Sequence, residues 1–430
     1  MAKQTDLETI CRGIEQAGSM DAYIDGQLRE RGFLVERRET DNMSRRELAR
    51  YKKELKDEAE EKRKLKAAAW QAYRHSHIVF LGDGVFWNDE SAEDKWDLDD
   101  AESRAAENEL PPLDRPKQLA EALGITLPQL RGLAFHRDVA DSVNYTRFSI
   151  PKRDGTERPI WAPLPRLKEA QRWILHQIVE RLLIHGAAHG FVPARSILSN
   201  ARVHADAKIV LKMDLKEFFP TITFPRVKGV FRRAGYRERI ATLLALICTE
   251  SPREVVEDGG KTKYVSLGPR CLPQGAPTSP ALTNVVCFKL DRRLTGLAKS
   301  FGYRYSRYAD DMTFSLPRRK KSDPNLGSLI GLVKRVVADE GFTVHPDKTH
   351  VARRGGRQAV TGLIVNGNDP PRVPRALRRR IRAAVHNLQN GKPPHEDESR
   401  STIEGYIAYI AMTDPELAGK LTAQLEATSL

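Results

Sequence analysis

The stretch that decides the fold reads Tyr305-Ser306-Arg307-Tyr308-Ala309-Asp310-Asp311-Met312-Thr313-Phe314-Ser315. Two short strand-like runs, 305–308 and 312–315, flank a three-residue turn, which predicts a tight β-hairpin. Asp310 and Asp311 are therefore expected at its tip. An Asp-Asp turn taken alone is more often a solvated surface turn than a cation site, so its meaning depends on what surrounds it.

A third carboxylate, Asp214, follows the β-rich run 208–213. The chain then leaves the strand through residues 215–220, so Asp214 is predicted at a strand end, where a rigid backbone can present chemistry. Together with Asp310 and Asp311 it offers the hard oxygen ligands that Mg²⁺ prefers. Two Mg²⁺ ions about 3.5–4 Å apart would activate an attacking hydroxyl and neutralise a triphosphate. The three aspartates are the candidate catalytic and metal-binding residues.

Between these carboxylates lies a turn of small residues, Leu272-Pro273-Gln274-Gly275-Ala276-Pro277-Thr278-Ser279-Pro280. An apolar helix is predicted after it, over 281–297, with Ser279 as its N-cap and Pro280 in its first turn. The turn is either a simple loop before a helix or a surface kept small so that a base pair and a nucleotide can approach. In the second interpretation Gln274 contacts the nucleotide.

Taken together, three segments resemble motifs A, B and C of reverse transcriptases, in the family's order. They are the strand that ends at Asp214, the Gln-Gly-x-Pro-x-Ser-Pro turn at 274–280 and the Tyr-Ala-Asp-Asp hairpin at 308–311. The resemblance covers roughly residues 111 to 420. It implies an α+β right-hand polymerase with fingers, palm and thumb, which copies RNA into DNA from deoxynucleoside triphosphates.

The resemblance extends to two basic residues of a predicted hairpin, whose strands are expected at 145–150 and 158–162. Lys152 and Arg158 are like the family's basic residues that hold the triphosphate. The alternative is that both are exposed hairpin charges.

Two further positions carry expected roles in sugar selection and catalysis. Phe219 resembles the aromatic residue that excludes a ribose 2′-hydroxyl, whereas neighbouring Phe218 is expected in the core. The segment 341–349 resembles motif D, and Lys348 within it is expected to protonate the departing pyrophosphate as a general acid. His345 stands in that segment where many relatives have Asn.

Two short signatures resemble those of bacterial retron reverse transcriptases: Asn200-Ala201-Arg202-Val203-His204 and Val360-Thr361-Gly362. Asn200 and His204 are accordingly RNA-binding candidates. The resemblance implies that the enzyme copies its own structured noncoding RNA, starts from a guanosine 2′-hydroxyl and makes branched multicopy single-stranded DNA. It also implies antiphage defence, commonly with a separate effector protein. About forty residues follow Gly391, too few for an RNase H domain, so host RNase H is expected to remove the template.

The remaining organisation is predicted as an N-terminal extension at 1–110, fingers and palm at 111–370 and a helical thumb at 371–430. An amphipathic helix over 375–388 carries four arginines expected to contact RNA: Arg378, Arg379, Arg380 and Arg382. Another helix is predicted over 167–183. The highly charged segment 44–66 is interpreted as a long helix that is either solvated or in contact with RNA.

Composition agrees with a nucleic-acid partner. The 71 Lys and Arg against 57 Asp and Glu give a formal net charge of +14. The four cysteines are scattered singly, and no apolar run approaches the length of a membrane span, so a cytoplasmic protein without membrane contact is expected. Other bacterial reverse transcriptases remain alternatives: intron maturase-like, diversity-generating or abortive-infection enzymes. An RNA-binding scaffold without catalysis is a further one, disfavoured by the intact aspartates and Gln274.

Overall fold

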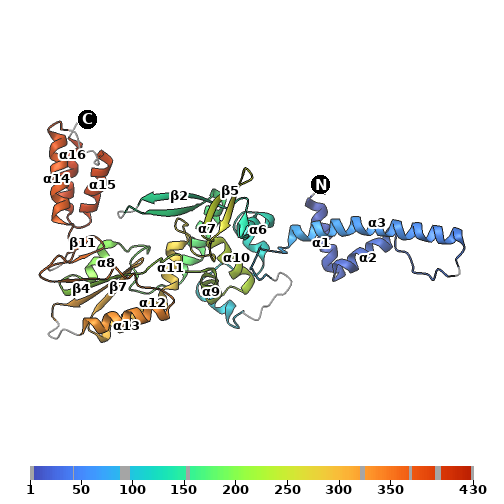
Figure 1. Ribbon diagram of the computed structural model, residues 1–430, viewed down its shortest axis with the longest axis horizontal. Helices are drawn as coiled ribbons and strands as arrows, with labels where there is room; N and C mark the ends of the chain where they lie inside the picture. Colours follow the sequence, from blue (N-terminus) through green and yellow to red (C-terminus); the bar gives the residue numbers. More distant parts are fainter. Residues whose placement is uncertain are drawn as a thin grey trace. The chain divides into compact units, whose positions relative to one another are not determined.

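The computed structural model describes residues 4–41, 43–87, 97–151, 155–319, 325–367, 370–392 and 399–427 (Figure 1). The chain forms two compact units. The first comprises Met1–Asn144, Phe231–Ile247 and Arg253–Leu267, and the second comprises Tyr145–Val230, Cys248–Pro252 and Gly268–Leu430. These units divide the chain differently from the predicted extension, fingers–palm and thumb, and that three-part division stays a prediction.

The first unit begins with three helices, α1 (Gln4–Ala17), α2 (Met20–Glu30) and α3 (Arg45–Ser76). Ser44 and Glu47 form a capping box at the start of α3, which satisfies two of its free backbone donors. Apolar residues of α1 and α2 pack on Leu65 and Ala69 of α3. The charged segment 44–66 is thus helical, as predicted, and one of its faces is buried.

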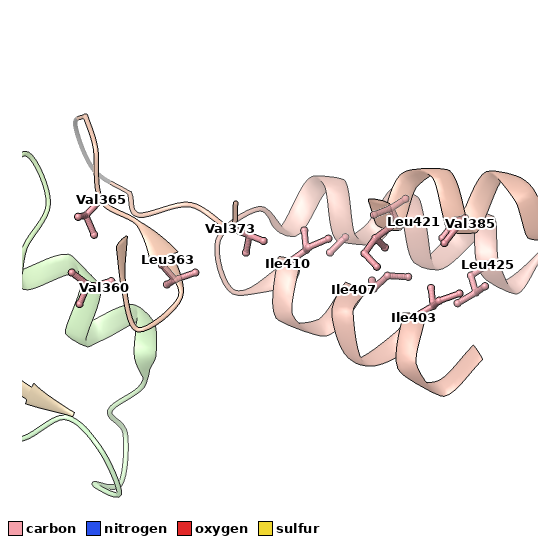
Figure 2. Close-up of a cluster of buried hydrophobic side chains, with 14 of the residues drawn as sticks. Val360, Leu363, Val365, Val373, Val385, Ile403, Ile407, Ile410, Leu421 and Leu425 are labelled. Carbon is pink, nitrogen blue, oxygen red and sulfur yellow. The ribbon is translucent and has the colours of Figure 1, made fainter. Parts of the chain in front are cut away.

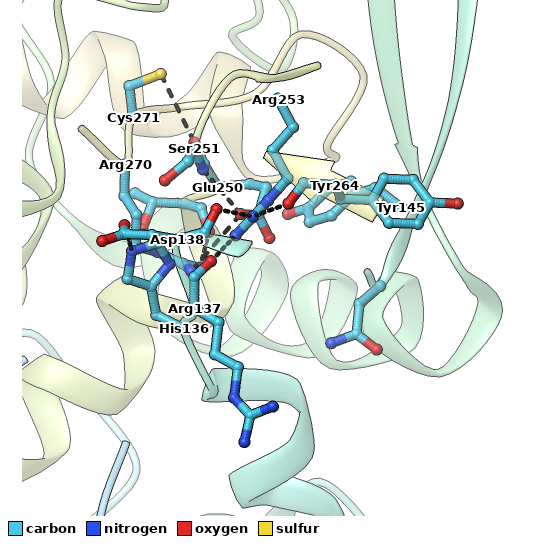
Figure 3. Close-up of polar contacts among 12 residues, drawn as sticks. His136, Arg137, Asp138, Tyr145, Glu250, Ser251, Arg253, Tyr264, Arg270 and Cys271 are labelled. Atoms are coloured by element: carbon cyan, nitrogen blue, oxygen red, sulfur yellow. Dashed lines mark hydrogen bonds and ion pairs between the residues drawn. The ribbon is translucent and has the colours of Figure 1, made fainter. Parts of the chain in front are cut away.

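The rest of the first unit combines short helices with a small antiparallel sheet. The helices are α4 (Ala101–Glu107), α5 (Pro116–Ala122) and α6 (Leu127–Ala134), and α9 (Phe224–Ala234) and α10 (Glu238–Cys248) contribute residues to both units. The sheet has the order β1 (Val139–Ala140), β6 (Lys261–Ser266) and β5 (Arg253–Asp258). The buried Arg253 guanidinium donates to the carbonyls of Arg137, Asp138 and Tyr264, so it ties the ends of these strands together (Figure 3).

The second unit is built around a four-stranded antiparallel sheet in the order β7 (Arg304–Tyr308), β8 (Asp311–Pro317), β4 (Ala207–Asp214) and β9 (His350–Arg353). Successive side chains of a strand point to opposite faces of the sheet, and those of β7 contact helices on both faces. Tyr305 and Arg307 reach Asp291 of α12 (Phe288–Ser300), whereas Ser306 reaches Asn200 of α8 (Ile197–Val203). Helices therefore cover both faces of the sheet, and α13 (Leu326–Asp339) packs on α12.

The predicted hairpin is confirmed as β2 (Tyr145–Pro151) paired with β3 (Glu157–Pro163). Lys152 lies outside the described residues. The helix predicted over 167–183 ends earlier than expected. It is α7 (Pro165–Gln177), and a separate 3₁₀ turn, η1 (Val179–Arg181), follows it.

The apolar helix predicted after the small-residue turn is two helices, α11 (Ser279–Val286) and α12, with Cys287 between them. Thr278 is the N-cap residue, so the prediction of Ser279 as N-cap was wrong. The Ser279 hydroxyl instead donates to the Pro273 carbonyl, 2.8 Å away, and braces the preceding turn.

The C-terminal helices α14 (Arg375–Gln389), α15 (Arg400–Ala411) and α16 (Pro415–Glu426) form a bundle, and α14 confirms the helix predicted over 375–388. Their apolar faces share one buried cluster with the short strands β10 (Ala359–Val360) and β11 (Leu363–Ile364) (Figure 2). Among the described residues, no helix is long and apolar enough to cross a membrane.

Candidate active site

Three aspartates meet where two strands of the central sheet end. Asp214, the last residue of β4, is the antiparallel partner of Asp311, the first residue of β8. The Leu215 backbone N–H donates to the Asp310 carbonyl at 3.0 Å, which holds the two strand ends in register. Ala309 turns the chain with a φ of 56°, a value that L-residues adopt rarely. The predicted strand end and hairpin tip are both confirmed, and they bring the three carboxylates together.

The electrostatics of the site show carboxylates crowded together and partly removed from water. Burial raises the pKa of Asp310, and the nearby Asp214 carboxylate raises it further. Burial also raises the pKa of Asp311, whereas Lys212 opposes that shift. Lys212 Nζ lies 3.6 Å from Asp311 Oδ2, and Lys348 Nζ lies 3.1 Å from Asp214 Oδ1. Two lysines thus supply the positive charge that this cluster requires.

The donor set fits a hard divalent cation, because carboxylate oxygens are the ligands such ions prefer. Among the described residues, no three His, Cys, Asp or Glu side chains already converge on one metal position. Lys348 and Lys212 hold the Asp214 and Asp311 carboxylates in ion pairs. A cation would compete with the same lysines for these oxygens.

The buried residue Arg307, which was not predicted as a site residue, supports the turn at Ala309 and Asp310. Arg307 is completely buried, and its Nε and Nη2 donate to both carboxylate oxygens of Asp291 at 2.8 and 2.7 Å. Its Nη2 also reaches Asn284 Oδ1 at 3.1 Å, and its Nη1 reaches the Ala309 carbonyl at 2.9 Å. The guanidinium therefore joins α11, α12 and the turn at Ala309 and Asp310. The available signal was a charged residue inside a run predicted to be a strand, next to the Asp310–Asp311 turn.

The segment 187–190 presses against the same turn. The His189 N–H donates to the Arg307 carbonyl, and the Arg307 N–H donates to the Ala187 carbonyl, both at 2.8 Å. A Cβ at Gly190 would lie 2.7 Å from the Ala309 nitrogen, so only glycine fits there without displacing the turn. The Gly190 carbonyl accepts from Asn284 Nδ2 at 2.8 Å. The turn is thus fixed from two sides.

The small-residue turn approaches the β2–β3 hairpin closely. The Trp161 N–H donates to the Gln274 carbonyl at 2.7 Å, and a Cβ at Gly275 would lie 2.6 Å from the Trp161 carbonyl. Gly275 also has a φ of +123°, which a side chain would strain. The Gln274 side chain is half-buried, and Arg158 is exposed on β3. The contact of both with a nucleotide stays a prediction.

The neighbouring phenylalanines after Asp214 have different surroundings. Phe218 is buried and packs against Phe342, whereas Phe219 is only half-buried. This agrees with the expected core position of Phe218 and leaves Phe219 partly exposed. The roles of Phe219 in sugar selection and of Lys348 as general acid stay predictions.

The structure corrects the expectation that Asn200 and His204 contact RNA. Both are buried, and His204 bonds Ser315 through Nδ1 and Ser306 through Nε2, each at 2.7 Å. Burial lowers the pKa of His204 to about 3, so the ring is neutral at physiological pH. Asn200 Oδ1 accepts from Ser306 Oγ at 2.6 Å. These side chains fasten α8 to the sheet and are withdrawn from the protein surface.

The two retron signatures meet at the base of the C-terminal bundle. Asn200 Nδ2 lies 3.5 Å from Thr361 Oγ1, which donates to the Ile197 carbonyl at 3.1 Å. A Cβ at Gly362 would lie 3.0 Å from the Tyr409 hydroxyl of α15. Residues 197–204 and 360–362 therefore form a joint between the sheet and the bundle.

The four arginines of α14 differ in exposure. Arg379, Arg380 and Arg382 are exposed, whereas Arg378 is half-buried and lies 3.7 Å from Asp414. Arg380 also stacks over the Tyr406 ring, with its guanidinium carbon 5.9 Å from the ring centroid. The expected RNA contact of this helix stays a prediction, and Arg379 and Arg382 are the most available residues for it.

Comparison with known proteins identifies the family. The family described as "Reverse transcriptase (RNA-dependent DNA polymerase)" matches residues 150–379. The retron Mx162 reverse transcriptase of Myxococcus xanthus is 48% identical over 424 residues, which cover 96% of this chain and 87% of that protein. The retron Mx65 enzyme of the same organism is 43% identical over 76% of this chain and 74% of its own. The retron Ec86 enzyme of Escherichia coli is 32% identical over 71% of this chain and 86% of its own. The chain belongs to the retron reverse transcriptases and is an RNA-directed DNA polymerase.

Proposed function

We propose that this enzyme copies its own structured noncoding RNA, begins from a 2′-hydroxyl within that RNA and produces branched multicopy single-stranded DNA. The observation that carries the proposal is the 48% identity to a retron reverse transcriptase over 96% of the chain. That similarity includes the C-terminal bundle as well as the sheet with the three aspartates. It favours a retron enzyme over the other bacterial reverse transcriptases.

At the active site, we assign Asp214, Asp310 and Asp311 to the binding of two Mg²⁺ ions. When bound, such ions lower the pKa of the attacking hydroxyl and neutralise charge on the triphosphate. The ion pairs restrain the free carboxylates, because Lys348 holds Asp214 and Lys212 holds Asp311. Lys348 would then be released from Asp214 and donate its proton to the departing pyrophosphate.

The substrate is positioned by groups around these carboxylates. Gln274 and Gly275 form a backbone surface braced by Trp161, against which the nucleotide base can lie. Arg158, and Lys152 outside the described residues, would pair with the triphosphate. The open edge of Phe219 would occupy the space that a ribose 2′-hydroxyl needs, so deoxynucleotides are preferred.

The biological partners follow from the same proposal. The exposed arginines of α14 would contact a stem of the cognate RNA, because guanidinium groups suit phosphate and hydroxyl contacts. Host RNase H would remove the copied template. The enzyme would act in the cytoplasm in antiphage defence, with a separate effector protein.

The nature of the DNA product tests this proposal. The protein should be purified from its native locus, and its bound nucleic acid treated with debranching enzyme and analysed on a denaturing gel. A 2′,5′-branched product changes mobility after this treatment. A product with a free 5′ end that resists both debranching enzyme and RNase would reject the retron product while leaving reverse transcription intact.

A further inference from the structure

One face of the long helix α3 carries cations without carboxylates. Its buried residues Leu65 and Ala69 pack against α1 and α2, which run beside it in Figure 1. Residues of an α-helix follow one another at 3.6 per turn, so positions rotated about 100–180° from Leu65 in one direction form a face away from these helices. Between residues 52 and 74 that face carries six exposed basic or aromatic residues, which we call the basic–aromatic face: Lys52, Lys56, Arg63, Lys66, Trp70 and Arg74.

No acidic residue lies on the basic–aromatic face. The six acidic residues of α3 lie on its other sides: Glu47, Glu54, Asp57, Glu58, Glu60 and Glu61. The nearest to the face, Glu60, pairs with Lys64 at 3.0 Å. The solvated-helix interpretation predicts cations and carboxylates intermixed on the exposed side. That pattern is present on the neighbouring side, at Lys53, Asp57, Glu60 and Lys64, whereas the basic–aromatic face itself carries cations alone.

The cations of α3 also differ in their pairing. Arg50 pairs with Glu54, Lys62 with Asp25 and Lys64 with Glu60, all away from the basic–aromatic face. Within the described part of the chain, the five cations of the face form no ion pair within 4 Å. Their charge is therefore available to an external anion along about 33 Å of helix.

The C-terminal end of the face adds aromatic rings to this charge. The Trp70 side chain is 37% exposed, and the Arg74 guanidinium carbon lies 5.8 Å from its ring centroid. Tyr73 meets Trp70 edge to face at 5.8 Å and stacks on His77 at 4.2 Å. These contacts hold the indole in place while one part of it stays open to solvent.

We infer that the basic–aromatic face of α3 binds single-stranded nucleic acid, with phosphates along Lys52, Lys56, Arg63 and Lys66 and an unpaired base stacked on Trp70. A row of cations followed by an exposed aromatic ring is the combination that single strands require, because every unpaired base offers a flat face. A duplex covers those faces except at its ends. The strand can be an RNA segment or the DNA product, which share this chemistry.

The test uses the full-length protein and fluorescence anisotropy with labelled strands of about 20 nucleotides, long enough to span the face. The same sequence is supplied as RNA, as DNA and as a blunt RNA duplex. The charge variant is Lys56→Gln/Arg63→Gln/Lys66→Gln. The matched control, Arg50→Gln/Lys62→Gln/Lys64→Gln, removes the same charge from paired positions of the same helix.

The charge variant should lower the slope of log affinity against log salt by about 2, since each phosphate contact to a single strand contributes about 0.7. The control should keep the wild-type slope, and duplex binding should change little. Trp70→Ala should weaken single-strand binding about tenfold, whereas Trp70→Phe should keep most of it. A loss confined to RNA or to DNA would support the inference and identify the strand.

Three results would overturn the inference. One is that the charge variant binds both single strands as the wild type does. Another is that the control variant loses as much single-strand affinity as the charge variant. The third is an equal loss on the duplex, which would assign the face to an RNA stem. Extension of a preformed short primer–template should stay unchanged in every variant, so a failure here is separate from a failure of the polymerase site.

Discussion

Arg307 is the residue whose replacement most directly tests how the catalytic turn is held. Arg307→Leu leaves the Asp291 carboxylate in the interior, where the Tyr305 hydroxyl at 2.8 Å is the remaining side-chain donor that we identify. Removal of one partner from a buried ion pair costs about 3–5 kcal/mol. We therefore expect the free energy of unfolding to fall by about that amount.

The double variant Arg307→Leu/Asp291→Leu separates stability from catalysis. Removing both charges eliminates the orphaned carboxylate, so most of the lost stability should return. The Ala309 carbonyl and Asn284 still lack their donor, and the turn that carries Asp310 loses its support. A displacement of about 1 Å at reacting groups can cost about 100-fold in rate, so primer extension should stay low.

Urea unfolding followed by circular dichroism gives the stabilities, and extension of an oligo(dT) primer on poly(rA) gives the activity. Extension is compared at urea-free conditions in which each variant is folded. A loss below about 1 kcal/mol in Arg307→Leu would refute the buried-pair reasoning. Wild-type extension by the double variant would refute the supporting role of Arg307 at the turn.

The remaining predictions concern the carboxylates, the sugar, one histidine and the thumb. Asp310→Asn should abolish extension while RNA binding persists, because an amide is a poor Mg²⁺ ligand of similar shape; activity within about tenfold of wild type would contradict the assignment. Phe219→Val should admit ribonucleotides. An unchanged preference for deoxynucleotides in competition assays would show that Phe219 is a packing residue and does not select the sugar. Burial lowers the pKa of His204 to about 3, so between about pH 6.5 and pH 3 the unfolded chain binds a proton that the folded chain refuses. Stability should then fall by about 1.4 kcal/mol per unit of decreasing pH in that window, and His204→Gln should lose this contribution in urea titrations at pH 7.5 and 5.5. Arg379→Gln/Arg382→Gln should weaken binding of the cognate RNA and lower its salt slope by up to about 0.9 for each phosphate that is no longer neutralised, with little effect on a generic primer–template; equal losses on both would indicate a general duplex clamp.

The catalytic elements were predictable because local sequence determines them. Asp214 follows an uninterrupted β-rich run, and the Asp310–Asp311 turn lies between two short strand-like runs, so strand ends and carboxylates could be placed from adjacent residues alone. The α14 helix was predictable for the same reason, since its apolar positions recur at helical spacing.

What could not be predicted depends on contacts distant in the chain. Arg307 and Asp291 are 16 positions apart, and nothing local indicates that a guanidinium buried in β7 meets a carboxylate on α12. Asn200 and His204 were RNA-binding candidates because their segment resembles a retron signature, yet Ser306 and Ser315 give them buried partners. The break at Cys287 likewise has no Gly or Pro to announce it.

The contact between residues 197–204 and 360–362 determines which segments must be exchanged together in a chimaera of two related enzymes. Thr361 has a φ of 45° and contacts α8, while Gly362 lies against Tyr409 of α15. The turn that precedes the bundle is therefore strained, and it contacts both α8 and the bundle. In a chimaera that receives only residues 371–430 of another retron enzyme, the new bundle would meet segments 197–204 and 360–362 that did not evolve with it. We expect its packing against them to be poorer. A chimaera that also receives 197–204 and 358–365 should keep these contacts, so the three segments are best exchanged together.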